Sequence, residues 1–244
     1  MIYSRIKVVV AHIMMLKVID DMLKYSFHIT LNQVKILKLL LNYQYQKIHI
    51  STIDYILNSG YINSKVSLLQ MLNDLNNKNL LTKIKDINDQ RKLNIILSSS
   101  QLNRIECVLT EIDDYLAHHF KHYFFITETD SVKYLIQSQQ IIKKLTQYLA
   151  LCDLSIEEIY VLGILSLHDH RLTIKELQYE QHHQFMTVSP IIKKLIEKKL
   201  VSKTRISHDE RCVAIQITKE KRSKINKVIE ACYNFLEKGI KYNH

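Results

Sequence analysis

Residues 191–218 read IIKKLIEKKLVSKTRISHDERCVAIQIT, and this stretch decides the fold because the chain contains it twice. Residues 71–98, MLNDLNNKNLLTKIKDINDQRKLNIILS, align with it without a gap, so that Arg91 falls on Arg211. A repeat of this length indicates one folding unit used twice, and any surface feature of that unit then also occurs twice. The period is far above the roughly 20 to 50 residues of solenoid repeats, so the sequence predicts a tandem of two domains.

The length of the chain agrees with two domains. Its 244 residues divide into an expected first domain, residues 1–122, and an expected second domain, residues 123–244, each of ordinary domain size. Apolar residues make up 47% of the chain and charged residues 24%, which is typical of a globular protein. The junction is aromatic and polar and contains no Gly-rich or Pro-rich linker, so we expect the two domains to pack together.

Helical periodicity dominates the first part of each half. Thr30 or Asn32 can cap a helix in the first half, and Ser155 with Glu158 has the capping-box pattern in the second half. The expected helices are residues 8–25, 32–45, 51–58, 64–77, 173–179 and 187–199.

After the last of these helices in each half, the period of the apolar residues changes from 3.6 to 2. Paired strands are expected at 81–85 with 93–97, and at 201–205 with 213–217, followed by a closing amphipathic helix. A helix-turn-helix followed by a two-stranded hairpin is the winged-helix arrangement. We therefore predict a mainly α-helical fold with small β-hairpins, in which two tandem winged-helix domains form a pseudo-two-fold dimer within one chain.

The chain is basic, with a net charge of +10 that divides evenly between its halves. Such a charge favours a polyanionic partner, most often nucleic acid and less often an anionic membrane, although it can also serve solubility alone. Cations on a wing can reach DNA phosphates or the minor groove, and neighbouring carboxylates can brace an Arg guanidinium. The wing residues expected at DNA are Lys83, Lys85, Asp89, Arg91, Lys92, Lys203, Arg205, Asp209, Glu210 and Arg211.

The second helix of each helix-turn-helix is expected to present its early polar side chains to base edges in the major groove. The second repeat carries Lys193 and Lys194 where the first has Asn73 and Asp74, so we expect the second repeat to be the stronger electrostatic partner. The recognition-helix residues expected at DNA are Asn63, Ser64, Lys65, Ser67, Gln70, Thr187, Ser189, Lys193 and Lys194.

The pattern K-x-R-x-x-x-D-E-R from Lys203 to Arg211 resembles the signature of the staphylococcal accessory regulator (SarA) family. The helix order of both halves is also similar, and the two-repeat length resembles the double-length members of that family. The resemblance implies a MarR-like winged-helix transcription regulator that binds AT-rich promoters of virulence genes. It also implies that the two repeats correspond to the two subunits of the single-repeat members of the family. It also implies DNA contacts by the last Arg of the signature and by the basic residue before the turn. In this chain these are Arg91 with Lys85, and Arg211 with Arg205.

The first repeat departs from the family pattern at two positions. Gln90 stands where Glu is usual, and Lys85 stands where Arg is usual. A lysine cannot make the bidentate contact that an arginine makes, and a neutral Gln braces Arg91 less strongly than a carboxylate. We therefore expect the first wing to bind DNA more weakly than the second.

Several classes of function are disfavoured by composition. The 3 glycines are too few and too scattered for a phosphate-cradling loop, and no motif places a catalytic pair, so we do not expect an enzyme. The 4 cysteines form no CxxC pair, which favours reduced thiols in the cytoplasm; Cys232 is expected in the core, and Cys212 is the better thiolate candidate. His118, His119 and His122 could chelate a metal from one helix, but no neighbouring Cys or Glu completes a motif, and no metal or cofactor is expected. No apolar run approaches the roughly 20 residues of a membrane span, and no signal peptide is expected.

These features together predict a cytoplasmic transcription regulator, activator or repressor, whose partner is double-stranded DNA. Its two recognition helices would meet successive major grooves roughly 34 Å apart. A second possibility is a protein-interaction module of the same fold that has lost DNA binding and sequesters a regulator. A third is a small-molecule sensor, for which the sequence indicates no pocket. Further dimerisation of the chain stays open.

Overall fold

The computed structural model describes residues 2–45, 51–60, 62, 64–85, 93–120, 131–168, 171–180, 187–206 and 209–241. These residues form two compact units, which we call the N-terminal unit and the C-terminal unit after the part of the chain that supplies most of each. The N-terminal unit comprises the described parts of Ile19–His119 together with residues 131–133. The C-terminal unit comprises the described parts of Met1–Val18 and Tyr134–His244.

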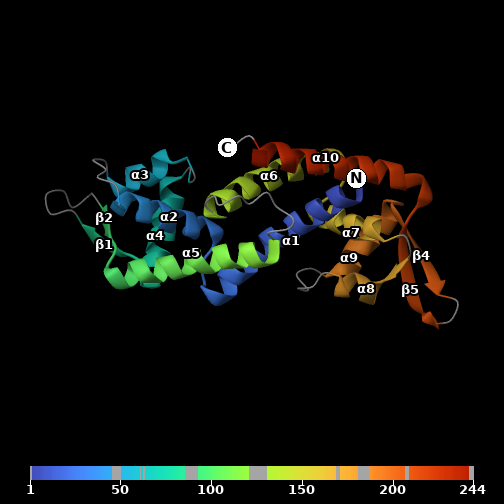
Figure 1. Cartoon of the computed structure of the whole chain (residues 1–244), viewed down its shortest axis with the longest axis horizontal. Helices are drawn as coiled ribbons and strands as arrows, with labels where there is room; N and C mark the ends of the chain where they lie inside the picture. Colours follow the sequence, from blue (N-terminus) through green and yellow to red (C-terminus); the bar gives the residue numbers. More distant parts are fainter. Residues whose placement is uncertain are drawn as a thin grey trace. The chain divides into compact units, whose positions relative to one another are not determined.

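The N-terminal unit contains a helix-turn-helix and a two-stranded hairpin (Figure 1). Strands β1 and β2 pair antiparallel, with Lys83 opposite Ile95 and Lys85 opposite Leu93. Helix α3 packs against α2 and β2, and α4 is the second helix of the motif. Its elements after the first helix, α1 (Ile2–Ser26), are α2 (Leu31–Tyr45), α3 (Thr52–Asn58), α4 (Lys65–Asn77), β1 (Thr82–Lys85), β2 (Leu93–Ile96) and α5 (Ser99–Phe120).

The C-terminal unit repeats this order and adds a short third strand (Figure 1). Its sheet has the order β3-β5-β4, and helix α7 packs against α9, α10 and β5. The elements are α6 (Ser131–Leu151), α7 (Ile156–Leu167), β3 (Leu172–Thr173), α8 (Ile174–Tyr179), α9 (Val188–Glu197), β4 (Val201–Ile206), β5 (Asp209–Ile217) and α10 (Lys219–Lys241).

Buried side chains recur at the positions that the sequence repeat aligns. In α5 and α10 the same five aligned positions are buried, and in α4 and α9 the same three. These two helix pairs therefore use the same apolar faces, as their helical spacing predicts. The aligned buried residues are Leu68, Leu72, Leu75, Ile105, Val108, Leu109, Ile112 and Leu116 in one copy, and Val188, Ile192, Leu195, Ile225, Val228, Ile229, Cys232 and Leu236 in the other.

The mainly helical fold with small hairpins is confirmed, and four elements differ from the sequence-based expectation. Helix α1 begins at Ile2 and not at residue 8, and α6 and β3 were not predicted. Strand β5 begins at Asp209 and not at residue 213, because pairing with β4 continues beyond an irregularity between Arg205 and Ile206. Local patterns missed β3 because its two residues are too few to show a period, and they are held by pairing with β5.

The two compact units do not coincide with the two halves of the sequence. The boundary predicted at residue 122 lies outside the described residues and stays a prediction. Helix α1 spans 25 residues and contributes to both units. Its first part packs in the C-terminal unit, where Arg5 forms an ion pair with Glu230 and its guanidinium lies over the Tyr233 ring.

His12 is buried in this first part of α1. Its Nδ1 lies 3.4 Å from the hydroxyl of Tyr134, and the two rings meet edge to face. Burial lowers the pKa of His12 from 6.5 to about 3, because the imidazolium would lose its hydration. The imidazole is therefore neutral in the folded C-terminal unit at neutral pH.

This histidine should make the C-terminal unit sensitive to acid. Since the folded-state pKa lies below the unfolded value, the unfolded chain takes up the proton first. The contribution of the neutral His12 to the free energy of unfolding is then fully present above pH 6.5 and is lost as the pH falls towards about 3. Near pH 4.5 the loss should reach about 2 to 3 kcal/mol. Denaturant unfolding between neutral pH and about pH 4.5 should show this slope in the wild type and a much smaller one in His12→Met.

A matched control for the acid effect is His28→Asn, because His28 is an exposed histidine of the N-terminal unit. Its backbone φ is 55°, a conformation that Asn tolerates. His28→Asn should keep the wild-type pH slope. An identical slope in His12→Met and wild type would show that His12 is not the group that titrates.

Candidate nucleic-acid interface

The helix-turn-helix of the C-terminal unit consists of α8 and α9. Helix α8 begins at a capping box in which the Thr173 N–H donates to Glu176 Oε2 at 2.6 Å, and the Glu176 N–H donates to Thr173 Oγ1 at 3.2 Å. Helix α9 buries one face, so its other face is open to solvent. The exposed side chains on and just before α9 are Thr187, Ser189, Pro190, Lys193, Lys194 and Glu197. The four residues of this segment that were predicted to face DNA are therefore all exposed.

The wing of this unit is the hairpin of β4 and β5. Lys203 pairs with Ile215 and Arg205 with Val213, and both cationic side chains are exposed. Residues two apart on a strand point to the same face, so these two cations lie side by side on one face of the wing. The backbones of Asp209, Glu210 and Arg211 belong to β5, but the positions of their side chains lie outside the described structure.

A buried carboxylate connects α9 to the start of α7. Glu158 is only 2% exposed, and its Oε2 accepts from the Ser155 N–H at 2.8 Å and from Lys198 Nζ at 2.9 Å. Desolvation lowers the pKa of Lys198, but the hydrogen bond and charge of Glu158, with those of Asp153, outweigh it and raise the pKa above its usual value. Lys198 therefore holds α9 in place, and its charge is compensated within the protein.

The helix-turn-helix of the N-terminal unit consists of α3 and α4. Ser51 and Ser64 cap the two helices through hydrogen bonds from the N–H groups of Asp54 and Ser67, which agrees with the helix start predicted at residue 64. Asn63 lies outside the described residues. The exposed side chains on and just before α4 are Ser64, Lys65, Val66, Ser67, Gln70, Asn73 and Asn77.

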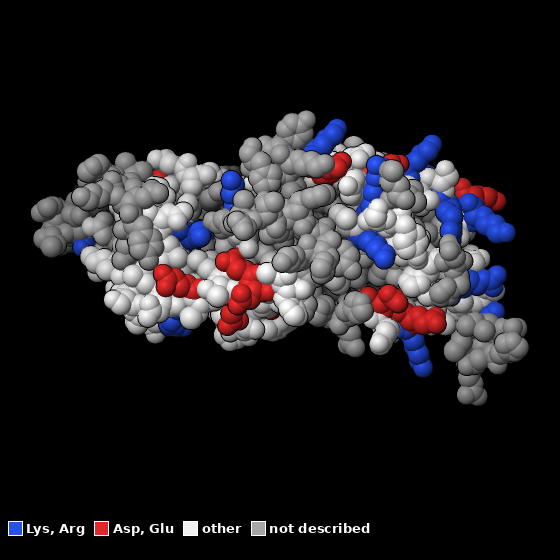
Figure 2. Space-filling model, in the orientation of Figure 1, with Lys and Arg blue, Asp and Glu red and all other residues white. Residues whose placement is uncertain are grey.

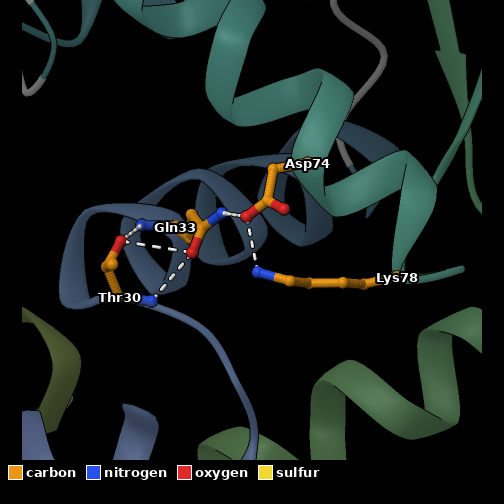
Figure 3. A network of polar contacts seen from close by, with 4 residues as sticks. All are labelled: Thr30, Gln33, Asp74 and Lys78. Atoms are coloured by element: carbon orange, nitrogen blue, oxygen red, sulfur yellow. Dashed lines mark hydrogen bonds and ion pairs between the residues drawn. The ribbon is translucent and has the colours of Figure 1, made fainter.

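In the N-terminal unit, α2 and α4 are joined by a network of Thr30, Gln33, Asp74 and Lys78, which we call the anchor network (Figure 3). It replaces the Glu158–Lys198 contact of the C-terminal unit. Thr30 Oγ1 accepts from the Gln33 N–H at 3.3 Å, as a Thr30 cap requires, and Gln33 Oε1 accepts from the Thr30 N–H at 2.8 Å. Gln33 Nε2 donates to Asp74 Oδ2 at 2.5 Å. The same Oδ2 accepts from Lys78 Nζ at 2.5 Å. The hydrogen bond from Lys78 is the main reason why the pKa of Asp74 lies below its usual value. The carboxylate that Glu158 supplies in the C-terminal unit is thus supplied here by α4 itself.

The described strands of the N-terminal wing carry two lysines, of which one is exposed. Lys83 is half-buried, its Nζ donates to Asn73 Oδ1, and its backbone N–H donates to Asn76 Oδ1 at 3.1 Å. Lys85 is exposed on the same strand face. The other predicted wing residues, Asp89, Arg91 and Lys92, lie outside the described residues.

The closing helices of the two units carry opposite charge. Figure 2 shows Lys and Arg over α10 and the β4–β5 hairpin, and Asp and Glu over α5. This difference was not identified from the sequence, although comparing the aligned helices residue by residue would have found it. The exposed residues concerned are Lys219, Arg222, Lys224, Lys227 and Lys238 on α10, and Glu106, Glu111, Asp113 and Asp114 on α5.

An open cleft of about 670 Å³ lies in the N-terminal unit, although the sequence indicated no pocket. Lys24, His28, Gln33, Asp74 and Lys78 are among its lining residues. Its polar groups include the anchor network of Figure 3, so part of the lining is already engaged in holding α4.

The remaining sequence-based expectations concern metals, thiols and membranes. Within the described residues, no group of three or more His, Cys, Asp or Glu side chains could hold a metal ion; His122 is not among these residues. Cys232 is buried as expected, and burial raises the pKa of its thiol to about 12, whereas the Cys212 side chain lies outside the described structure. None of the described helices is long and apolar enough to cross a bilayer.

The duplicated helix-turn-helix with a cationic wing is the architecture of winged-helix transcription regulators. Residues 140–228 match the family model "Transcriptional regulator SarA/Rot". This segment includes residues 203–211, whose pattern resembles the signature of that family.

Individual proteins are similar over part of the chain. The HTH-type transcriptional regulator SarZ of Staphylococcus aureus (strain USA300) is 36% identical over 87 residues, which are 36% of this chain and 58% of SarZ. The chain thus spans little more than half the length of the curated relatives that it matches. Two MepR structures from S. aureus are also similar. A point mutant of MepR has a TM-score of 0.41 and 23% identity, over 48% of this chain and 85% of MepR. A MepR–DNA complex has a TM-score of 0.37 and 24% identity, over 47% and 81%.

Proposed function

We propose that this protein is a transcription regulator that binds double-stranded DNA at AT-rich promoters, including promoters of virulence-related genes, in the cytoplasm. The observation that carries the proposal is the group of four exposed cations that α9 and the β4 strand present in the C-terminal unit. These are Lys193, Lys194, Lys203 and Arg205. The match of the same segment to a family of transcription regulators supports it.

The chemistry of these groups fits DNA better than a neutral ligand. Exposed lysines on a helix and a wing neutralise phosphates and release counterions, which supplies most of the sequence-independent affinity. An Arg on a wing is suited to the minor groove, whose negative potential is strongest in narrow A-tracts. We therefore assign phosphate contacts to Lys193, Lys194 and Lys203, and minor-groove contacts to Arg205 and Arg211.

The two wing arginines provide a direct test. Arg211→Ala should weaken binding to an AT-rich duplex more than Arg91→Ala, because Arg211 follows Glu210 whereas Arg91 follows the neutral Gln90. An expected loss is about 1 to 3 kcal/mol for Arg211 and less for Arg91. Fluorescence anisotropy titration of both variants and the double variant measures it. Wild-type affinity in the double variant would remove the wings from the interface.

A second candidate function is sequestration of another regulator through the closing helices. The exposed acidic residues of α5 favour this alternative, because an acidic helix repels DNA. Salt separates the two functions: binding to DNA through several cations should weaken log-linearly and steeply with salt concentration. We place DNA binding first because the exposed cations of the C-terminal unit lie both on its recognition helix α9 and on strand β4 of its wing.

A further inference from the structure

The outward faces of the two recognition helices differ in chemical type, not only in charge. In α4, Leu68, Leu72 and Leu75 are buried, so the residues on the other side of the helix face solvent. That side carries three exposed amides, Gln70, Asn73 and Asn77. We name these three residues the amide stripe of α4.

The corresponding side of α9 carries no amide, and Asn77 aligns with the exposed Glu197. The sequence repeat aligns Gln70 with Pro190, whose side chain can neither donate nor accept a hydrogen bond, and Asn73 with Lys193. Lys193 and Lys194 are both exposed, and neither takes part in an ion pair within the described part of the chain. A lysine is a compact charge on a flexible stem, which suits a phosphate more than a geometrically defined base edge.

Few charged groups lie near the amide stripe. Asp74 and Lys78 compensate each other in an ion pair, whereas Lys83 donates to the neutral Asn73 Oδ1 and keeps its charge. Lys65 at the first turn is the one cation of α4 itself, Lys78 being the residue that follows its last turn. The outward face of α4 therefore has one cation of its own, against Lys193 and Lys194 on α9, so we expect it to contribute less to DNA binding through phosphates.

The amide stripe has the spacing and the chemistry to read adenines. Asn and Gln can bind adenine bidentately, accepting from N6 and donating to N7. Gln70 and Asn73 lie about 4.5 Å apart along the helix axis, and Asn77 lies about 6 Å further. These steps correspond to between one and two of the roughly 3.4 Å steps between successive bases of one strand. The hydrogen bond from Lys83 already holds the Asn73 side chain, which reduces the entropy lost on binding.

We infer that the two units divide the work on DNA: the amide stripe of α4 reads adenine-containing sequence, and the lysines of α9 supply sequence-independent affinity. This inference rests on the proposed DNA binding. It assigns the specificity-determining residues to the unit with the weaker electrostatic field. Because phosphate contacts add affinity for every sequence, a recognition helix with few of them can depend more strongly on its base contacts and so discriminate between sequences.

Two matched double variants of the full chain test the division. Gln70→Ala/Asn77→Ala removes two amides, neither of which forms a hydrogen bond within the described residues, and alanine preserves the helix. Lys193→Gln/Lys194→Gln removes two charges at similar length. Each variant and the wild type are allowed to select from duplexes with a random central segment, and the bound fraction is sequenced. Affinity for a fixed AT-rich duplex is measured against salt concentration, and circular dichroism verifies folding.

The amide variant should lose about tenfold of the adenine preference at one part of the selected motif, with an unchanged salt slope. The lysine variant should keep the motif and lose about 1.8 from the slope of log K against log salt. Retention of the motif by the amide variant, or loss of the motif by the lysine variant, would overturn the division of roles while DNA binding stands. If the wild type binds no duplex even at low salt, the proposed function fails and the division of roles fails with it.

Discussion

Replacing Lys193, Lys194, Lys203 and Arg205 together by glutamine should weaken binding to an AT-rich duplex by about a thousandfold at about 0.15 M salt. Each phosphate contact contributes about 0.9 to the slope of log K against log salt, so the loss of four contacts should flatten this slope by about 3.6. All four side chains are exposed, so the substitutions should leave the fold intact. Titrations by fluorescence anisotropy at several salt concentrations give both the affinity and the slope.

The control for this prediction is the corresponding change in the N-terminal unit, Lys65→Gln/Lys83→Gln/Lys85→Gln. It should cost only about tenfold, because Lys83 is half-buried with its ammonium held by Asn73, and α4 has Lys65 as its one cation. Equal losses in the two variants would contradict the unequal roles of the two units. No loss in the four-residue variant would remove the C-terminal unit from the DNA interface.

Glu158→Ala should destabilise the C-terminal unit by about 3 kcal/mol, the largest stability effect that we expect from a polar residue. The substitution removes the acceptor of the Ser155 N–H at the start of α7 and the carboxylate that binds Lys198 after α9. Lys198 keeps some access to water and its contact with the Asp153 carbonyl, which limits the cost. The measurement is denaturant unfolding, combined with hydrogen exchange of the α7 and α9 amides to assign the loss to this unit.

Glu158→Gln is the matched variant, because the N-terminal unit already uses a Gln at the equivalent cap. A Gln keeps the acceptor for the Ser155 N–H and loses the charge that Lys198 faces, so the loss should be about half that of Glu158→Ala. In the N-terminal unit, Gln33→Glu should be unfavourable, because it brings a second carboxylate against Asp74. An unfolding midpoint of Glu158→Ala equal to that of the wild type would show that this anchor does not stabilise the fold.

Much of the fold could be predicted from the sequence because its signals are local or repeated. The apolar spacing in the closing helices, the Ser155–Glu158 capping box and the change of period at the hairpins each depend on a few neighbouring residues. The repeat supported these predictions, because the same pattern occurs at aligned positions in both halves of the chain. Of the two caps that the sequence offered for α2, Thr30 and Asn32, the structure uses Thr30, and the helix predicted from residue 64 has Ser64 as its N-cap.

The site was less predictable, because long-range contacts decide which cations stay available. Lys78 and Lys198 align in the repeat and look alike in sequence, yet one binds Asp74 and the other binds Glu158. Lys83 was expected at DNA, and this stays a prediction; the sequence did not indicate that its ammonium donates to Asn73 Oδ1. The packing of the first part of α1 in the C-terminal unit could not be predicted from local patterns either. It depends on contacts of His12 with Tyr134 and of Arg5 with Glu230, which are distant in the sequence. The predicted contacts at Asn63, Asp89, Arg91, Lys92, Asp209, Glu210 and Arg211 stay predictions, because their side chains lie outside the described structure.

The most direct test of DNA binding is the affinity of the unmodified chain for an AT-rich duplex between about 50 and about 200 mM salt. Four or more phosphate contacts predict a straight line of log K against log salt with a slope of about −3.6 or steeper. A flat line, or no binding at the lowest salt, would contradict DNA binding and leave protein sequestration as the better account of this fold.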